Sequence, residues 1–168
     1  MDVACLGIIV ADVMGKTIEK MPEPGKLEIF EQMELHPGGC ATNTAIGLAK
    51  LGVKTRIMGK VGRDSFADFI LRILNNHKVD TSGIKQTEKR ATAFTFAAIN
   101  KKGERGFFHY TGANEELKLE DIDFNLIKDS QILHIAGSYL MPQFDLSLIH
   151  ISEPTRLLSI SYAVFCLK

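Results

Sequence analysis

The segment that decides the fold reads Pro37-Gly38-Gly39-Cys40-Ala41-Thr42-Asn43-Thr44-Ala45, and it leads into a helix of small residues that ends near Gly52. Two adjacent glycines let the backbone turn sharply and approach a ligand without interference from a Cβ atom. At the start of a helix, free N–H groups and the positive end of the dipole point toward the bound group. Asn43 adds an amide that both donates and accepts hydrogen bonds. Because the loop contains no Lys or Arg, it favours a polyhydroxylated ligand over a bare phosphate.

An apolar run precedes this loop and covers Val3 to Ala11 without interruption. Such a run is typical of a strand that is buried on both faces of a parallel sheet. The run ends at Asp12, and ligands of open α/β sheets bind beyond the carboxyl ends of the strands. We therefore expect Asp12 to accept hydrogen bonds from ligand hydroxyl groups, although an Asp that caps a turn would fit the same position.

Helical and strand patterns alternate along much of the chain. Residues 64–77 carry an apolar face with the period of a helix. Shorter patterns predict helices over 44–51 and 120–128 and strands over 55–59 and 131–137. Strands that alternate with helices in this way predict a parallel α/β sheet.

A β-hairpin is predicted where two aromatic-rich runs, 92–99 and 106–110, flank a charged loop that contains glycine. With residues 27–35, these runs are expected to form a small antiparallel sheet that stands apart from the main one. Thr95 and His109 lie on the hairpin, where alternate residues share a face, so either side chain can point into a pocket or into solvent.

Asn114 follows the hairpin closely. Its amide can line the same pocket or close a turn, and the sequence leaves both interpretations open.

The composition disfavours several classes of function. The 168 residues include 20 basic and 20 acidic side chains, which are interspersed, whereas nucleic-acid binding or a polybasic membrane contact needs a basic cluster. The first apolar run is too short to span a membrane and lacks the basic start of a signal peptide. Cys5, Cys40 and Cys166 are widely separated and are interpreted as reduced thiols, not metal ligands. We expect a cytoplasmic protein with a small-molecule ligand.

The run Gly38–Ala45, followed at fixed spacing by Gly52 and Gly62, resembles the first signature of the ribokinase-like sugar kinases, also called the PfkB family. Segments 59–64 and 79–84 resemble those that follow the signature in such kinases. The resemblance implies a three-layer α/β/α fold with a mostly parallel sheet and a small β-sheet lid. The lid strands are expected within about 14–36 and 91–111.

In function, the resemblance implies transfer of the γ-phosphoryl group of ATP, with Mg²⁺, to a sugar hydroxyl, and a homodimer that can form through the lid. Two alternatives stay open: a nucleoside kinase of the same fold, and a non-catalytic module for sugar binding or dimerisation. The residues expected to contact the sugar are Asp12, Gly38, Gly39, Asn43, Thr95, His109 and Asn114.

The family places its glycine-rich GAGD-type loop, its catalytic aspartate and most of its nucleotide pocket in the C-terminal half. No such loop occurs in these 168 residues. Residues 1–145 are therefore expected to be the truncated N-terminal part of a kinase domain, without catalytic residues. Residues 146–156 and 160–167 are also what the two ends of a transposase-type sequencing adapter would encode in one frame, so residues 146–168 are interpreted as an artefactual tail.

Overall fold

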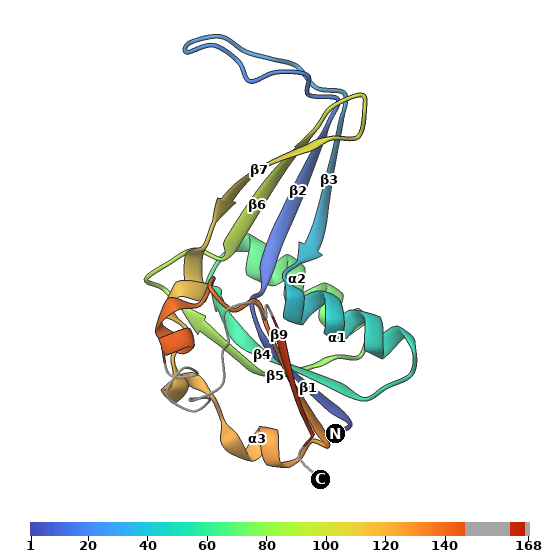
Figure 1. Cartoon of the computed structure of the whole chain (residues 1–168), viewed down its shortest axis with the longest axis vertical. Helices are drawn as coiled ribbons and strands as arrows, with labels where there is room; N and C mark the ends of the chain where they lie inside the picture. Colours follow the sequence, from blue (N-terminus) through green and yellow to red (C-terminus); the bar gives the residue numbers. More distant parts are fainter. Residues whose placement is uncertain (147–161, 167–168) are drawn as a thin grey trace.

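Two β-sheets organise the computed structural model, which describes residues 1–146 and 162–166 (Figure 1). The larger sheet has the strand order β5-β4-β1-β8-β9. β1 pairs in parallel with β4 and β8, β4 pairs in parallel with β5, and β9 runs antiparallel to β8. This confirms the predicted, mostly parallel α/β sheet. Its strands are β1 (Val3–Gly7), β4 (Thr55–Gly62), β5 (Asp80–Thr87), β8 (Ile132–Ala136) and β9 (Tyr162–Cys166).

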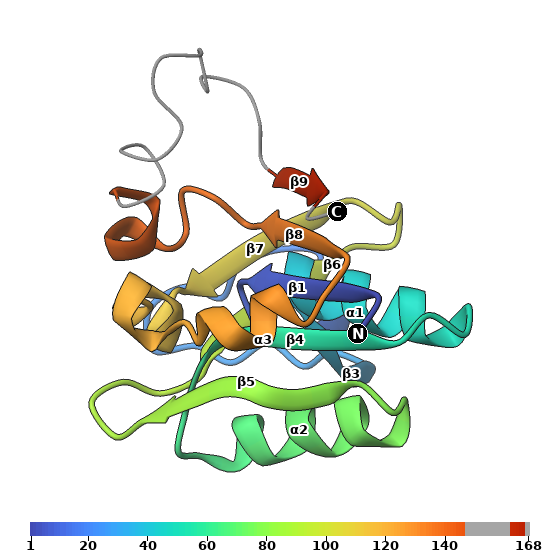
Figure 2. The same ribbon diagram turned by 90° about the horizontal axis from the view of Figure 1, so that it is seen from below.

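Helical segments cover both faces of the larger sheet, which gives the predicted three layers (Figure 2). On one face, α1 and α2 pack over the buried Cys5 and Ile57. On the other face, α3 and two short 3-10 segments pack over Leu6 and Met58. The helical segments are α1 (Cys40–Lys50), α2 (Ser65–Asn76), η1 (Gly112–Glu116), η2 (Leu119–Asp121) and α3 (Phe124–Lys128).

The smaller sheet stands off the larger one as a lid, with the strand order β3-β2-β6-β7 (Figure 1). Within it, β2 pairs antiparallel with β3 and parallel with β6, and β6 pairs antiparallel with β7. The expectation of a purely antiparallel sheet is therefore wrong, because the sheet is mixed around β2. The strands are β2 (Val10–Lys16), β3 (Gln32–Gly38), β6 (Ala93–Ile99) and β7 (Arg105–Tyr110).

The chain crosses between the sheets inside the apolar run that was predicted to be one strand. β1 ends at Gly7 and β2 begins at Val10, so that only Ile8 and Ile9 connect them. Asp12 consequently lies within a lid strand and not at the carboxyl end of a core strand. The predicted strand over 27–35 is also shifted, because β3 begins only at Gln32.

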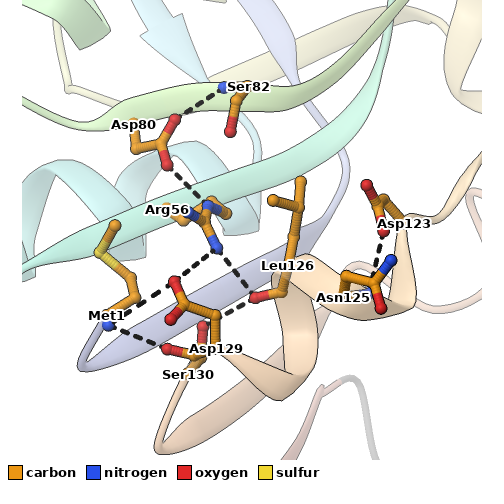
Figure 3. A network of polar contacts seen from close by, with 9 residues as sticks. All are labelled: Met1, Arg56, Asp80, Ser82, Asp123, Asn125, Leu126, Asp129 and Ser130. Atoms are coloured by element: carbon orange, nitrogen blue, oxygen red, sulfur yellow. Dashed lines mark hydrogen bonds and ion pairs between the residues drawn. The ribbon is translucent and has the colours of Figure 1, made fainter.

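A buried arginine joins two strands and a helix at the end of the larger sheet where β4 and β5 begin (Figure 3). Arg56 of β4 donates from Nε to Asp80 Oδ2 of β5 (2.6 Å) and from Nη1 to the carbonyl of Leu126 in α3 (2.9 Å). Its Nη1 also lies 3.5 Å from Asp129 Oδ2, and the Met1 nitrogen donates to the Asp129 carbonyl (2.9 Å). Because a buried charge is tolerated only when it is paired and hydrogen-bonded, this network fixes α3 and β5 against β4.

The interpretation of residues 146–168 as a tail falls mainly outside the described residues, which exclude 147–161 and 167–168. Within that segment, residues 162–166 form β9 at the edge of the larger sheet.

Among the described residues, no helix is long and apolar enough to cross a membrane.

Candidate functional site

A pocket of about 360 Å³ lies where the lid meets the larger sheet, within the size range of small-molecule sites. Three lid strands contribute alternate residues to it, and alternate residues of a strand share one face. From the lid, the lining residues are Val10, Asp12, Met14, Thr95, Ala97, Ile99, Arg105, Phe107 and His109. The rest of the lining is formed by Ile8, Gly39, Cys40, Asn43 and Leu140. Two other hollows, near residues 17–31 of the lid, contain none of the predicted site residues.

Four polar residues form a row across the base of the lid. The strand register places His36 opposite Asp12, Asp12 opposite Thr95, and Thr95 opposite His109. A hydrogen bond of 3.0 Å joins Thr95 Oγ1 to His109 Nδ1. Three residues predicted from separate parts of the sequence, Asp12, Thr95 and His109, therefore lie side by side on the pocket face.

The two glycines are required by close contacts on either side of the loop. A Cβ atom at Gly38 would overlap the carboxylate of Asp12, and one at Gly39 would overlap the carbonyl oxygen of Ile8. Gly39 also has a φ of 91°, which L side chains rarely adopt. Gly38 thus leaves room for the Asp12 carboxylate, and Gly39 turns the chain from β3 into α1.

Asn43 lies in the first turn of α1, where its backbone N–H donates to the Gly39 carbonyl (2.9 Å). Its exposed side chain lines the pocket. α1 has no acidic residue in its first turn and no side-chain cap. The first N–H groups of the helix therefore remain available to a ligand oxygen beside the Asn43 amide.

Asn114 lies outside this pocket, and its amide is engaged elsewhere. Asn114 Oδ1 accepts from the backbone N–H of Ile9 (3.2 Å), while its Nδ2 donates to the Ile9 carbonyl (3.1 Å). The residue is only 1% exposed. Of the two sequence interpretations, the structure favours the turn-closing one, since Asn114 holds the connection between β1 and β2.

Several lining residues were not identified from the sequence, notably Met14, Arg105 and Phe107. All three lie on the same face as Asp12, Thr95 or His109. The alternation along the lid strands would have revealed them once β2 was recognised as a lid strand. Within the described part of the chain, no group of three His, Cys, Asp or Glu side chains could hold a metal ion.

The sequence matches the pfkB family carbohydrate kinases over residues 1–150. The chain belongs to this family. A Pyrococcus horikoshii protein that is described as a sugar kinase is 29% identical to this chain over 139 residues, which make up 83% of this chain and 43% of that protein.

Two solved structures share the fold. A nucleoside kinase of Methanocaldococcus jannaschii, an archaeal member of the ribokinase family, overlaps 93% of this chain and 50% of its own with a TM-score of 0.72 and 28% identity. An Escherichia coli protein described as a ribokinase II, solved with ATP and Mg²⁺, overlaps 82% of this chain and 43% of its own with a TM-score of 0.71 and 27% identity. This chain thus spans half or less of each of these three relatives.

Proposed function

We propose that residues 1–145 form the acceptor-binding part of an ATP-dependent carbohydrate kinase. The observation that carries this proposal is the convergence of Asp12, Gly39 and Asn43 on one pocket beneath the lid. A carboxylate, an amide and the N–H groups at a helix start together donate and accept the hydrogen bonds that a polyhydroxylated ligand needs.

Each of these residues would hold the acceptor in a different way. The Asp12 carboxylate accepts hydrogen bonds from two neighbouring hydroxyl groups, and the Asn43 amide orients a third from the side of α1. Thr95 and His109 close over the ligand from the lid. Holding the acceptor in one pose and excluding water is a large part of catalysis of phosphoryl transfer, which depends mainly on positioning and electrostatics.

ATP with Mg²⁺ would supply the phosphoryl group, as the complex of the E. coli relative suggests. Among the described residues, no group of three His, Cys, Asp or Glu side chains could hold a metal ion. We propose that the nucleotide site and the catalytic base belong to sequence that this chain does not contain, and we derive no step through them.

A nucleoside is the second candidate acceptor. It is favoured by the overlap with the M. jannaschii nucleoside kinase, which extends over 93% of this chain.

A homodimer through the lid is also part of the proposal. It is supported by exposed apolar side chains on the lid face opposite the pocket, such as Met33 and Phe108.

The acceptor site can be tested by binding alone. Isotope-labelled 168-residue chain is titrated with D-fructose, D-ribose and adenosine while the amide signals of Gly39 and Asn43 are followed by NMR. One of these ligands should shift both signals. The variant Asp12→Asn should weaken that binding about tenfold or more, because a neutral amide replaces a charged acceptor.

Asp68→Asn is the matched control, since Asp68 is exposed on α2 and lies outside the pocket. It should bind as the unaltered chain does. Binding that maps to another surface, or that Asp12→Asn leaves unchanged, would refute the acceptor site.

A further inference from the structure

Arg105 occupies the outer end of the pocket face. It is the first residue of β7 and pairs with Ile99, while Phe107 pairs with Ala97 and His109 with Thr95. Because alternate residues share a face, the Arg105 side chain lies on the same side of the lid as Asp12, and both line the pocket. The polar row at the base and the guanidinium at the outer end thus belong to one site.

Two of the charges on this face have no ionic partner among the described residues. Two cations lie on it, and one of them, Lys16, is paired with Glu34 at 2.9 Å. The neighbouring Glu104 carboxylate accepts from the Asn100 side chain (2.7 Å). Within the residues that the structure describes, no ion pair reaches Arg105 and no side-chain hydrogen bond engages the Asp12 carboxylate. The pocket therefore has an unpaired anion at its base and an unpaired cation at its outer end.

The spacing of the two ends sets the length of a suitable ligand. Arg105 and His109 are four residues apart on one strand, which corresponds to about 13 Å between their Cα atoms. This separation leaves space for a ligand chain of several carbons between the two ends. Between the ends, the lining side chains of the lid are apolar, with Met14, Ala97 and Phe107 among them.

We propose that the acceptor carries an anionic group at the end remote from the hydroxyl groups held by Asp12, and that Arg105 binds this group. This inference rests on the acceptor site proposed above. A carboxylate and a phosphate both match the fork of a guanidinium, so the ligand class is a sugar acid or a sugar phosphate. Arg105 would determine specificity without taking part in the chemistry.

The test compares three probes on the 168-residue chain by the same NMR titration: D-gluconate, D-glucose 6-phosphate and the neutral D-glucitol. At low ionic strength, at least one anionic probe should bind about three- to tenfold more tightly than D-glucitol, as expected for an exposed but charge-assisted contact. High salt should reduce the difference, because exposed charges are screened. Which anion binds more tightly identifies the carboxylate or the phosphate as the group bound.

Two variants test whether Arg105 causes the preference for the anionic probes. Arg105→Gln should remove the preference for the anion, so that the anionic probes and D-glucitol bind with similar affinity. Lys102→Gln is the control, since Lys102 is an exposed cation of the same hairpin that does not line the pocket. Equal binding of all three probes, or a preference that survives in Arg105→Gln, would overturn the role of Arg105 but keep the acceptor site. If none of these probes and none of the ligands tested above binds, both the role of Arg105 and the acceptor site are rejected.

Discussion

Asp64 shows how one carboxylate can join a helix of the core to a strand of the lid. Its Oδ1 accepts from the Ala67 N–H (2.9 Å), which caps α2, and from Thr92 Oγ1 (2.8 Å). Its Oδ2 accepts from the Thr92 N–H (2.7 Å), one residue before β6. Burial by itself raises the pKa of Asp64, but the hydrogen bonds from Thr92 and Ala67 outweigh it, and the pKa is lowered.

The lowered pKa predicts that the contribution of Asp64 to stability depends on pH. A carboxylate whose folded pKa lies below its unfolded value stabilises the fold above the unfolded pKa, about 3.9, and loses this effect as the pH falls through the folded pKa. Asp64→Asn should cost about 1 kcal/mol in the free energy of unfolding at neutral pH. Urea denaturation at pH 7 and near pH 3 should show that this cost shrinks in acid. Asp68→Asn, in the same helical turn but exposed, should cost less at pH 7, because an exposed carboxylate in the first turn gains only its interaction with the helix dipole. An equal cost for Asp64→Asn at both pH values would contradict the assignment.

Among the site residues, the sequence predicted best those that lie close to one another along the chain. The pair Gly38-Gly39 and Asn43 lie within six positions of each other, so that one loop and one helical turn already bring them together. Asp12 was assigned to the site from its place after an apolar run, although it lies in a different strand from the one expected. The bonds of Asn114 to Ile9 span 105 positions, and no local pattern carries such a contact.

At the scale of elements, Asn114 clamps the connection between the two sheets. Replacement by Ala would leave the N–H and the carbonyl of the buried Ile9 without partners, at about 1–3 kcal/mol for each unsatisfied group. Asn114→Ala should therefore destabilise the chain by about 2–4 kcal/mol in urea denaturation, and hydrogen exchange of the Ile9 amide should accelerate. Asn125→Ala, an exposed Asn in α3, should change neither quantity. A loss of stability without faster exchange at Ile9 would argue against the clamp.

One helix, α2, was predicted more closely than the division of strands between sheets, whereas α1 begins at Cys40 and not at 44, and the expected helix over 120–128 is replaced by η2 and the shorter α3. α2 runs from Ser65 to Asn76, against an expected 64–77, because its apolar face is periodic and Asp64 marks its start. The division between β1 and β2 was missed because every residue from Val3 to Ala11 is buried. The chain leaves one sheet and enters the next without reaching solvent, so no polar residue interrupts the apolar pattern.

For the whole molecule, we expect no phosphoryl transfer by the 168-residue chain itself. The chain is proposed to hold an acceptor but to lack a nucleotide site, and positioning one substrate cannot by itself move a phosphoryl group. The measurement is ADP formation from MgATP in the presence of the sugars, sugar acids and nucleosides named above, with an active kinase of the same family as the positive control.

The variant Asp12→Asn distinguishes turnover by the chain from turnover by a contaminating kinase. Activity that the variant retains would come from a contaminant. Acceptor-dependent turnover of about 1–100 s⁻¹, typical of kinases, that disappears in the variant would refute the proposal that the catalytic half lies outside this chain.

The contact between Gly38 and Asp12 also links the evolution of the two positions. A side chain at position 38 needs space that the Asp12 carboxylate occupies, so the residue at 12 decides which residues are tolerated at 38. A smaller residue at 12 would make room, but at the loss of the charged acceptor. Neither position can therefore change first without weakening the site. Acceptor preference is expected to diverge instead at the outer lid, where exposed residues such as Phe107 meet no such constraint.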